Sequence, residues 1–143
     1  MTDLERMLSD IEMEVALTRD LIGKDALNER VMAAMQRVSR HEFISEILRY
    51  RAYDNGPLPI GAGQTISQPY IVALMTDLLN PEPDQVILEI GTGSGYQTSV
   101  LSHLVKQIYS VEIIAELAAE ASSRLNRLGY HNVKIRIGDG YFG

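Results

Sequence analysis

Three groups of residues in the sequence have the types and spacing needed to bind a nucleoside-containing ligand. The first is the glycine-rich segment Gly91-Thr92-Gly93-Ser94-Gly95, and the others are the acidic residues Glu112 and Asp139. Each follows a run of residues whose pattern is typical of a β-strand. In an open α/β sheet, ligands bind at the carboxyl ends of the strands. The sequence therefore predicts that the three groups converge on one binding site.

The glycine-rich segment allows the backbone to approach a ligand closely, and a helix that begins there presents amide groups that attract anions. A dinucleotide-binding fingerprint requires glycine at position 96, where this chain has the bulky Tyr96. This side chain weighs against NAD, and a phosphate-binding P-loop is excluded because no Gly-Lys-Ser/Thr follows. The alternative is a glycine turn that serves only to reverse the chain, since short glycine patterns are common.

The two acidic residues suit the ribose and the base of a nucleoside. Glu112 lies 21 positions after Gly91, and a carboxylate at that spacing can accept both hydrogen bonds of a ribose diol. An exposed carboxylate at a strand end is the alternative for Glu112. Asp139 lies between two glycines and suits contact with an adenine amino group, although Gly-Asp-Gly is equally an ordinary turn.

The elements that must position these residues follow an α/β pattern. Predicted strands at 86–90, 108–113 and 133–137 alternate with predicted helices at about 96–105 and 115–128. This order predicts half of a doubly wound, mainly parallel, Rossmann-like sheet with right-handed crossovers, helices on both faces and a buried first strand. Such a sheet is incomplete, so we expect another copy of the chain or a swapped element to cover its open edge.

Amphipathic helices precede this pattern. A capping-box spacing at the start predicts a helix to about residue 21, and helical spacing of apolar residues predicts a second helix at 27–38. Residues 40–53 are less regular. Residues 54–68 are rich in glycine and proline, which predicts a loop, and a loop this long in a compact domain is usually either functional or disordered. A third helix is predicted to begin at Pro69.

Composition excludes several classes of protein. The 143 residues carry a formal charge of −6, so the chain lacks the basic face that nucleic-acid binding requires. The sequence contains no cysteine, which excludes disulfides and thiolate metal sites. The three histidines are far apart and follow no metal-ligand spacing, so we expect no metal site. No apolar run approaches the roughly 20 residues that span a bilayer, so no membrane contact is expected. These features favour a single cytoplasmic domain.

Several segments resemble the protein-L-isoaspartate (D-aspartate) O-methyltransferase family, whose members are class I S-adenosylmethionine-dependent methyltransferases. Residues 54–70, which include Gly61-Ala62-Gly63-Gln64-Thr65-Ile66-Ser67-Gln68-Pro69-Tyr70, look like the substrate loop of that family. Residues 88–96, 111–112 and 128–141 also match. The family usually has proline where this chain has Ser39, and it continues beyond the length of this chain, so we expect a C-terminally truncated member.

The resemblance implies transfer of a methyl group from S-adenosylmethionine to the α-carboxyl of L-isoaspartyl residues in damaged proteins or peptides, which are then the expected partners. It implies one domain over 1–143, with an N-terminal helical part at 1–53, the substrate loop at 54–68 and the first half of the cofactor-binding core at 69–143. The alternative is a truncated, catalytically inactive chain that binds S-adenosylmethionine. A nucleotide-dependent oxidoreductase is disfavoured by Tyr96.

The resemblance also implies roles for individual residues. Ser67 matches the active-site serine of the family, and we expect it to orient the acceptor carboxylate rather than act as a nucleophile, because no His/Asp partnership for a triad is evident. Its alternative role is to cap the helix that begins at Pro69. Substrate binding is expected from Gln64, Thr65, Ile66 and Ser67. Cofactor binding is expected from Glu89, Gly91, Thr92, Gly93, Gly95, Glu112, Asp139 and Gly140.

Overall fold

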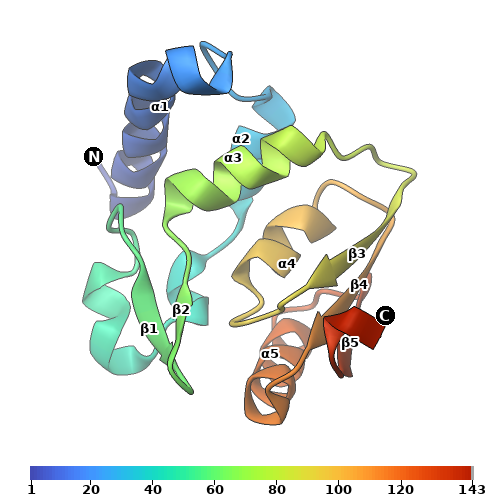
Figure 1. Cartoon of the computed structure of the whole chain (residues 1–143). Coiled ribbons are helices and arrows are strands. Elements are labelled where there is room, and N and C mark those ends of the chain that lie inside the picture. Colours follow the sequence, from blue (N-terminus) through green and yellow to red (C-terminus); the bar gives the residue numbers. More distant parts are fainter. Residues whose placement is uncertain (143) are drawn as a thin grey trace.

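The computed structural model of the chain describes residues 1–142, so Gly143, the last residue of the predicted core, lies outside the described residues. Figure 1 shows three helices, α1 to α3, packed together beside a two-stranded hairpin, and a three-stranded sheet accompanied by α4 and α5. One hydrophobic core joins the two parts, because buried side chains of all five helices belong to the same cluster.

The N-terminal helices begin and end close to where the sequence predicts. Helix α1 spans Asp3–Ile22, and at its start the Thr2 hydroxyl accepts from the Glu5 amide while the Glu5 carboxylate accepts from the Thr2 amide. It ends at Gly23, which has a φ of 71°. Helix α2 spans Glu29–Arg37. The less regular stretch that follows forms two 3₁₀ turns, Arg40–Phe43 and Glu46–Arg51.

The predicted loop at 54–68 contains a short hairpin that the sequence pattern does not reveal. Strand β1, Leu58–Gly61, pairs antiparallel with β2, Gln64–Ile66. Leu58 and Ile66 lie opposite one another and are both buried, so the hairpin is fixed to the core by its base. The glycines and prolines that predicted a loop occupy the turn and the flanks of strands too short to produce a clear alternating pattern.

Helix α3, Pro69–Leu79, follows the hairpin directly and packs against both α1 and α2. Proline at its first position needs no hydrogen-bond acceptor there, as predicted. The helix ends at Asn80, which has a left-handed φ of 52°. Because only two residues separate the end of β2 from the start of α3, the hairpin is held at one end by a helix that belongs to the core.

The sheet consists of β3, Val86–Ile90, β4, Gln107–Glu112, and β5, Val133–Ile137, all parallel in the order β3-β4-β5. Helices α4, Tyr96–Ser102, and α5, Ala115–Arg127, form the crossovers. The register places Ile90 beside Val111 and Glu112 beside Ile137. The carboxyl ends of the three strands therefore meet at one edge, which confirms the predicted α/β order.

Only one face of the sheet is covered by helices in residues 1–142, so the prediction of a buried first strand with helices on both faces is wrong for this part of the chain. The inward residues of the strands, Ile87, Ile108 and Ile135 among them, contact the core that includes α4 and α5. The opposite face carries apolar side chains that are 45–59% exposed: Val86, Leu88, Ile90 and Tyr109. An apolar run alone does not distinguish a strand buried on both faces from one whose second face is open.

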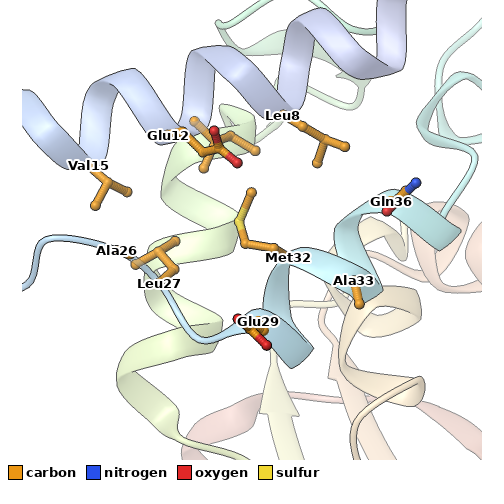
Figure 2. A pocket seen from close by; sticks show the side chains of 10 residues that line it. Leu8, Glu12, Val15, Ala26, Leu27, Glu29, Met32, Ala33 and Gln36 are labelled. Carbon is orange, nitrogen blue, oxygen red and sulfur yellow. The ribbon is translucent and has the colours of Figure 1, made fainter.

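A separate groove of about 390 Å³ lies between α1 and α2. Figure 2 shows Met32 of α2 reaching toward α1 between Leu8 and Val15, with Glu12 and Glu29 beside it. None of the residues that line this groove belongs to the binding site predicted from the sequence.

Candidate functional site

The glycine turn joins the end of β3 to the start of α4 through three residues in the left-handed region. Gly91, Gly93 and Gly95 have φ values of 91°, 57° and 89°, which other residues adopt only at a cost. The Gly91 amide donates to the Val111 carbonyl at 2.8 Å and so continues the ladder between β3 and β4. A Cβ at Gly91 would meet no atom within 4 Å. The turn therefore leaves open space over the first glycine, where a ligand can approach the backbone.

Glu112, the last residue of β4, fastens this turn to the neighbouring strand. Its Oε1 accepts from the Gly93 amide at 2.7 Å and its Oε2 from the Ile114 amide at 3.0 Å. The residue is only 5% exposed, so the alternative of an exposed strand-end carboxylate is wrong. Each carboxylate oxygen has a second acceptor position, so the side chain can still accept hydrogen bonds from a ligand.

Glu89 lies beneath the turn at the centre of a polar network. Its Oε1 accepts from the Ser110 hydroxyl at 2.6 Å and from the Thr98 hydroxyl. The Ser110 hydroxyl also lies 2.5 Å from that of Thr92, within the glycine turn. The Thr92 side chain therefore points into the protein, and a ligand can reach this residue only through its backbone.

The environment of Glu89 disfavours its charged form. Burial raises the pKa of its carboxyl group, hydrogen bonds from Ser110 and Thr98 oppose the rise, and the negative charge of Glu112 adds to it. Two acidic side chains therefore lie under the same turn, and the negative charge of Glu112 disfavours ionisation of Glu89.

Asp139 follows β5 at the same edge of the sheet. The Gly138 amide donates to the Glu112 carbonyl at 2.9 Å, so the chain leaves β5 directly beside β4. The Asp139 carboxylate is exposed and accepts from the Tyr141 amide at 2.9 Å, as in an ordinary turn. A Cβ at Gly140 would lie 2.4 Å from Cγ2 of Ile90, so this glycine is needed for the turn to pack against β3. The contacts of both residues with a cofactor stay predictions.

The substrate residues predicted from the resemblance lie on β2 and just after it. Gln64, Thr65 and Ser67 are exposed, whereas Ile66 is buried in the core and can offer a ligand only its backbone. Among residues 1–142 the Ser67 hydroxyl has no hydrogen-bond partner. The cap position of α3 is Gln68, which makes no side-chain cap bond, so the alternative role of Ser67 as a helix cap is not observed.

The hairpin lies against the glycine turn. Cδ1 of Ile60, on β1, is 3.7 Å from the position that a Cβ on Gly93 would occupy. A cleft of about 440 Å³ opens between the hairpin, the turn and α5, and the Arg124 guanidinium donates to the Ser94 carbonyl at 2.9 Å along its wall. The structure thus brings together the loop and the glycine turn, which are about 30 residues apart in the sequence. Residues that line this cleft include Pro59, Ile60, Gly61, Gly93, Ser94 and Arg124.

Several residues support the site through contacts that the sequence pattern does not predict. The Glu14 carboxylate of α1 accepts from Asn55 at 2.6 Å and from Gln68 at 3.0 Å, which ties both ends of the loop to a helix more than 40 residues earlier in the chain. No local pattern reveals such contacts. Ser110 is different, because a polar residue at an inward position of an apolar strand is itself a signal of a buried hydrogen bond.

The described part of the chain contains neither a metal-binding cluster nor a membrane-spanning helix. Among residues 1–142, no group of three or more His, Asp or Glu side chains is arranged to hold a metal ion. Within the same residues, every helix is too short or too polar to cross a bilayer.

Comparison with known sequences gives a consistent picture. Residues 12–143 match the family model of protein-L-isoaspartate(D-aspartate) O-methyltransferase. The chain is 60% identical over 137 residues to protein-L-isoaspartate O-methyltransferase 2 of Nitrosococcus oceani, covering 96% of this chain and 63% of that protein. It is 57% identical to the protein of the same name from Polaromonas sp., covering 96% and 65%. The chain thus spans less than two thirds of the length of these curated relatives.

Solved structures resemble the fold over nearly its whole length. A protein-L-isoaspartate O-methyltransferase structure aligns with a TM-score of 0.76 at 27% identity, covering 98% of this chain and 43% of that chain. A β-aspartate methyltransferase from Plasmodium falciparum, in complex with S-adenosyl-L-homocysteine, aligns with a TM-score of 0.74 at 24% identity, covering 99% and 65%. The second likeness concerns the fold alone.

Replacing Glu89 with Gln tests the electrostatics of the network. Because its pKa is raised in the folded state, wild-type Glu89 contributes stability that is full at low pH and is lost as the pH rises through the folded-state pKa. Glutamine carries no charge and is not affected by this loss. The free energy of unfolding of E89Q should therefore increase relative to that of the wild type as the pH increases from 4 to 8. Urea denaturation at several pH values measures this, with the exposed Glu116→Gln as the control. If the difference in free energy of unfolding between E89Q and the wild type did not change with pH, the raised pKa of Glu89 would be contradicted.

Proposed function

Because the chain belongs to the protein-L-isoaspartate(D-aspartate) O-methyltransferase family, we propose that it binds S-adenosylmethionine at the strand ends and methylates the α-carboxyl of L-isoaspartyl residues in damaged proteins. The observation that carries this proposal is the meeting of the glycine turn, anchored by Glu112, with the hairpin that Ser67 follows directly in the chain. The relatives named above support the reaction, and the fold shared with a complex of S-adenosylhomocysteine supports the cofactor.

The residues of the turn fit the cofactor chemically. The open space over Gly91 admits a ligand, and the buried Glu112 carboxylate has unused acceptor positions suited to a ribose diol. The negative charge of Glu112 disfavours a further anion in this region. When bound, S-adenosylmethionine supplies a methyl group on a positively charged sulfonium. Contacts from the backbone of Gly91 and Gly93, and from Asp139 and Gly140, complete the proposed cofactor site.

The acceptor needs orientation rather than activation. A carboxylate is ionised at neutral pH, so the enzyme requires no strong general base. Ser67 is exposed and its hydroxyl is free to donate to one acceptor oxygen, and Gln64 and Thr65, which are also exposed, precede it on β2. The enzyme accelerates the reaction by holding the acceptor oxygen in line with the methyl group and by excluding water from the site. Ser67 therefore acts as an orienting donor and forms no covalent bond.

A second candidate function is cofactor binding without turnover. The observation that favours it is the exposed apolar face of the sheet, which includes Leu88. In that case the chain binds S-adenosylmethionine while methyl transfer is absent. Measuring binding and turnover separately distinguishes the two functions.

We also propose that the protein acts in the cytoplasm on protein or peptide substrates.

We further propose that a second copy of the chain covers the open edge and the exposed face of the sheet. A contiguous exposed apolar face is typical of an interaction surface. Strands β3 and β5 are the two edges of the described sheet and offer unpaired backbone groups to a partner.

Self-association is tested on the exposed face itself. Leu88 is 59% exposed, so Leu88→Glu should leave the fold intact and shift the chain toward the monomer in sedimentation velocity. The matched control is Leu17→Glu, at a residue of α1 that is 78% exposed and lies away from the sheet. A wild-type chain that sediments as a single monomer at micromolar concentration would contradict the proposed self-association.

Cofactor binding is tested by Glu112→Gln. The amide side chain offers one acceptor oxygen where the carboxylate offers two, so the turn loses an anchor and the ligand loses an acceptor. Affinity for S-adenosylhomocysteine, measured by calorimetry, should fall roughly tenfold or more. The exposed Glu116→Gln is the matched control and should bind as the wild type does. Tight binding of NAD with no binding of S-adenosylhomocysteine would overturn the cofactor assignment.

Methyl transfer is tested by Ser67→Ala with an isoaspartyl peptide, using the aspartyl version as the substrate control. Loss of one orienting hydrogen bond should lower kcat/KM about tenfold and leave the affinity for S-adenosylhomocysteine unchanged. Ser9→Ala, an exposed serine of α1, is the matched variant. Equal transfer to the two peptides would sink the proposed specificity, whereas wild-type cofactor binding without any transfer would select the second candidate function.

A further inference from the structure

Arg40 occupies an unusual position for a charged side chain. It is 0% exposed, and among residues 1–142 it forms no ion pair with a carboxylate. Its Nε donates to the Ala52 carbonyl at 2.7 Å and its Nη2 to the Ser67 carbonyl at 2.9 Å. Nη1 is buried without a hydrogen-bond partner. Burying an unpaired charge is costly, so the arrangement calls for a specific role.

The two carbonyls that Arg40 binds stand at the two ends of the substrate loop. Ala52 lies two residues before the segment 54–68, and Ser67 lies one residue before its end. A single guanidinium therefore closes the loop at its base, beside the residue that is expected to orient the acceptor. The planar fork of arginine suits this task, because it can donate in two fixed directions at once.

The same guanidinium lies over the ring of Tyr96, with Cζ 4.6 Å from the ring centroid. Tyr96 is the first residue of α4 and follows Gly95 of the glycine turn directly. Phe43 packs edge-on against the Tyr96 ring at 5.6 Å between centroids. Burial raises the pKa of Tyr96 to about 12, so the ring stays neutral and interacts through its face rather than as an anion. Arg40 is thus packed between the loop and the turn.

We propose that Arg40 is a positioning residue that couples the two halves of the site. It binds the Ala52 and Ser67 carbonyls while it is stacked on Tyr96, and so it holds the substrate loop in a fixed position relative to the glycine turn. The inference rests on the proposed function, since it concerns the same cofactor and acceptor. Its consequence is that a ligand bound at the glycine turn also steadies the hairpin that carries Gln64 and Thr65.

Amide hydrogen exchange of the full chain, with and without S-adenosylhomocysteine, tests the coupling. Binding is first measured by calorimetry on the wild type, because a chain that binds no S-adenosylhomocysteine overturns the proposed function and the coupling with it. In the wild type, saturating ligand should slow exchange of the β1 and β2 amides several-fold. Ligand that slows exchange at the glycine turn and leaves the hairpin unchanged would overturn the coupling alone.

Arg40→Lys keeps the charge but loses the fork and the planar stacking. Without ligand, its hairpin amides should exchange about tenfold faster than in the wild type while those of α1 are unchanged, and ligand should no longer slow them. Arg37→Lys, an exposed residue of α2, is the matched control. Tyr96→Phe keeps the ring face and should retain the coupling. Equal ligand protection of the hairpin in R40K and the wild type would overturn the proposal.

A measurement on the unmodified chain covers the case in which R40K does not fold. The Nε–H resonance of Arg40, followed by NMR, should shift along the same saturation curve as the glycine-turn amides when S-adenosylhomocysteine is added. An Arg40 resonance that stays fixed while the turn amides saturate would overturn the proposal.

Discussion

The contact between the Glu112 carboxylate and the Gly93 amide is the one on which the rest of the site depends. It joins the glycine turn to the end of β4, while the second oxygen holds the Ile114 amide where α5 begins. A buried carboxylate is tolerated only when its oxygens are hydrogen-bonded, and here the backbone meets that requirement. These hydrogen bonds restrict the turn, and a restricted turn loses less entropy when it binds a ligand.

This arrangement also explains which ligand the turn suits. Two carboxylates, Glu89 and Glu112, lie beneath it, and the repulsion between them contributes to the raised pKa of Glu89. A ligand with a pyrophosphate would bring further negative charge to this region, and Tyr96 removes the third glycine that a dinucleotide site requires. Electrostatics and turn geometry thus both weigh against a ligand with a pyrophosphate.

Much of this fold follows from local pattern. The alternation of strands and helices after residue 85 and the convergence of Glu112 with the glycine turn were predictable, because periodicity fixes the elements and parallel strands align their ends. The hairpin at 58–66 was not, since its strands are too short for a pattern to emerge. The open face of β3 and the buried Arg40 were also missed, because exposure and pairing there depend on residues distant in the sequence. The contacts of Arg40 with Ala52 and Ser67, for example, span 12 and 27 positions.

We propose that the cofactor binds at the glycine turn, which Glu112 holds in place. A titration of the ¹⁵N-labelled chain with S-adenosylhomocysteine, followed through its amide resonances, tests it most directly. We predict saturable shifts at Gly91, Gly93 and Ile114, with no change at Met32 in the groove between α1 and α2. Shifts confined to that groove, or resonances of the turn that do not move, would contradict the account.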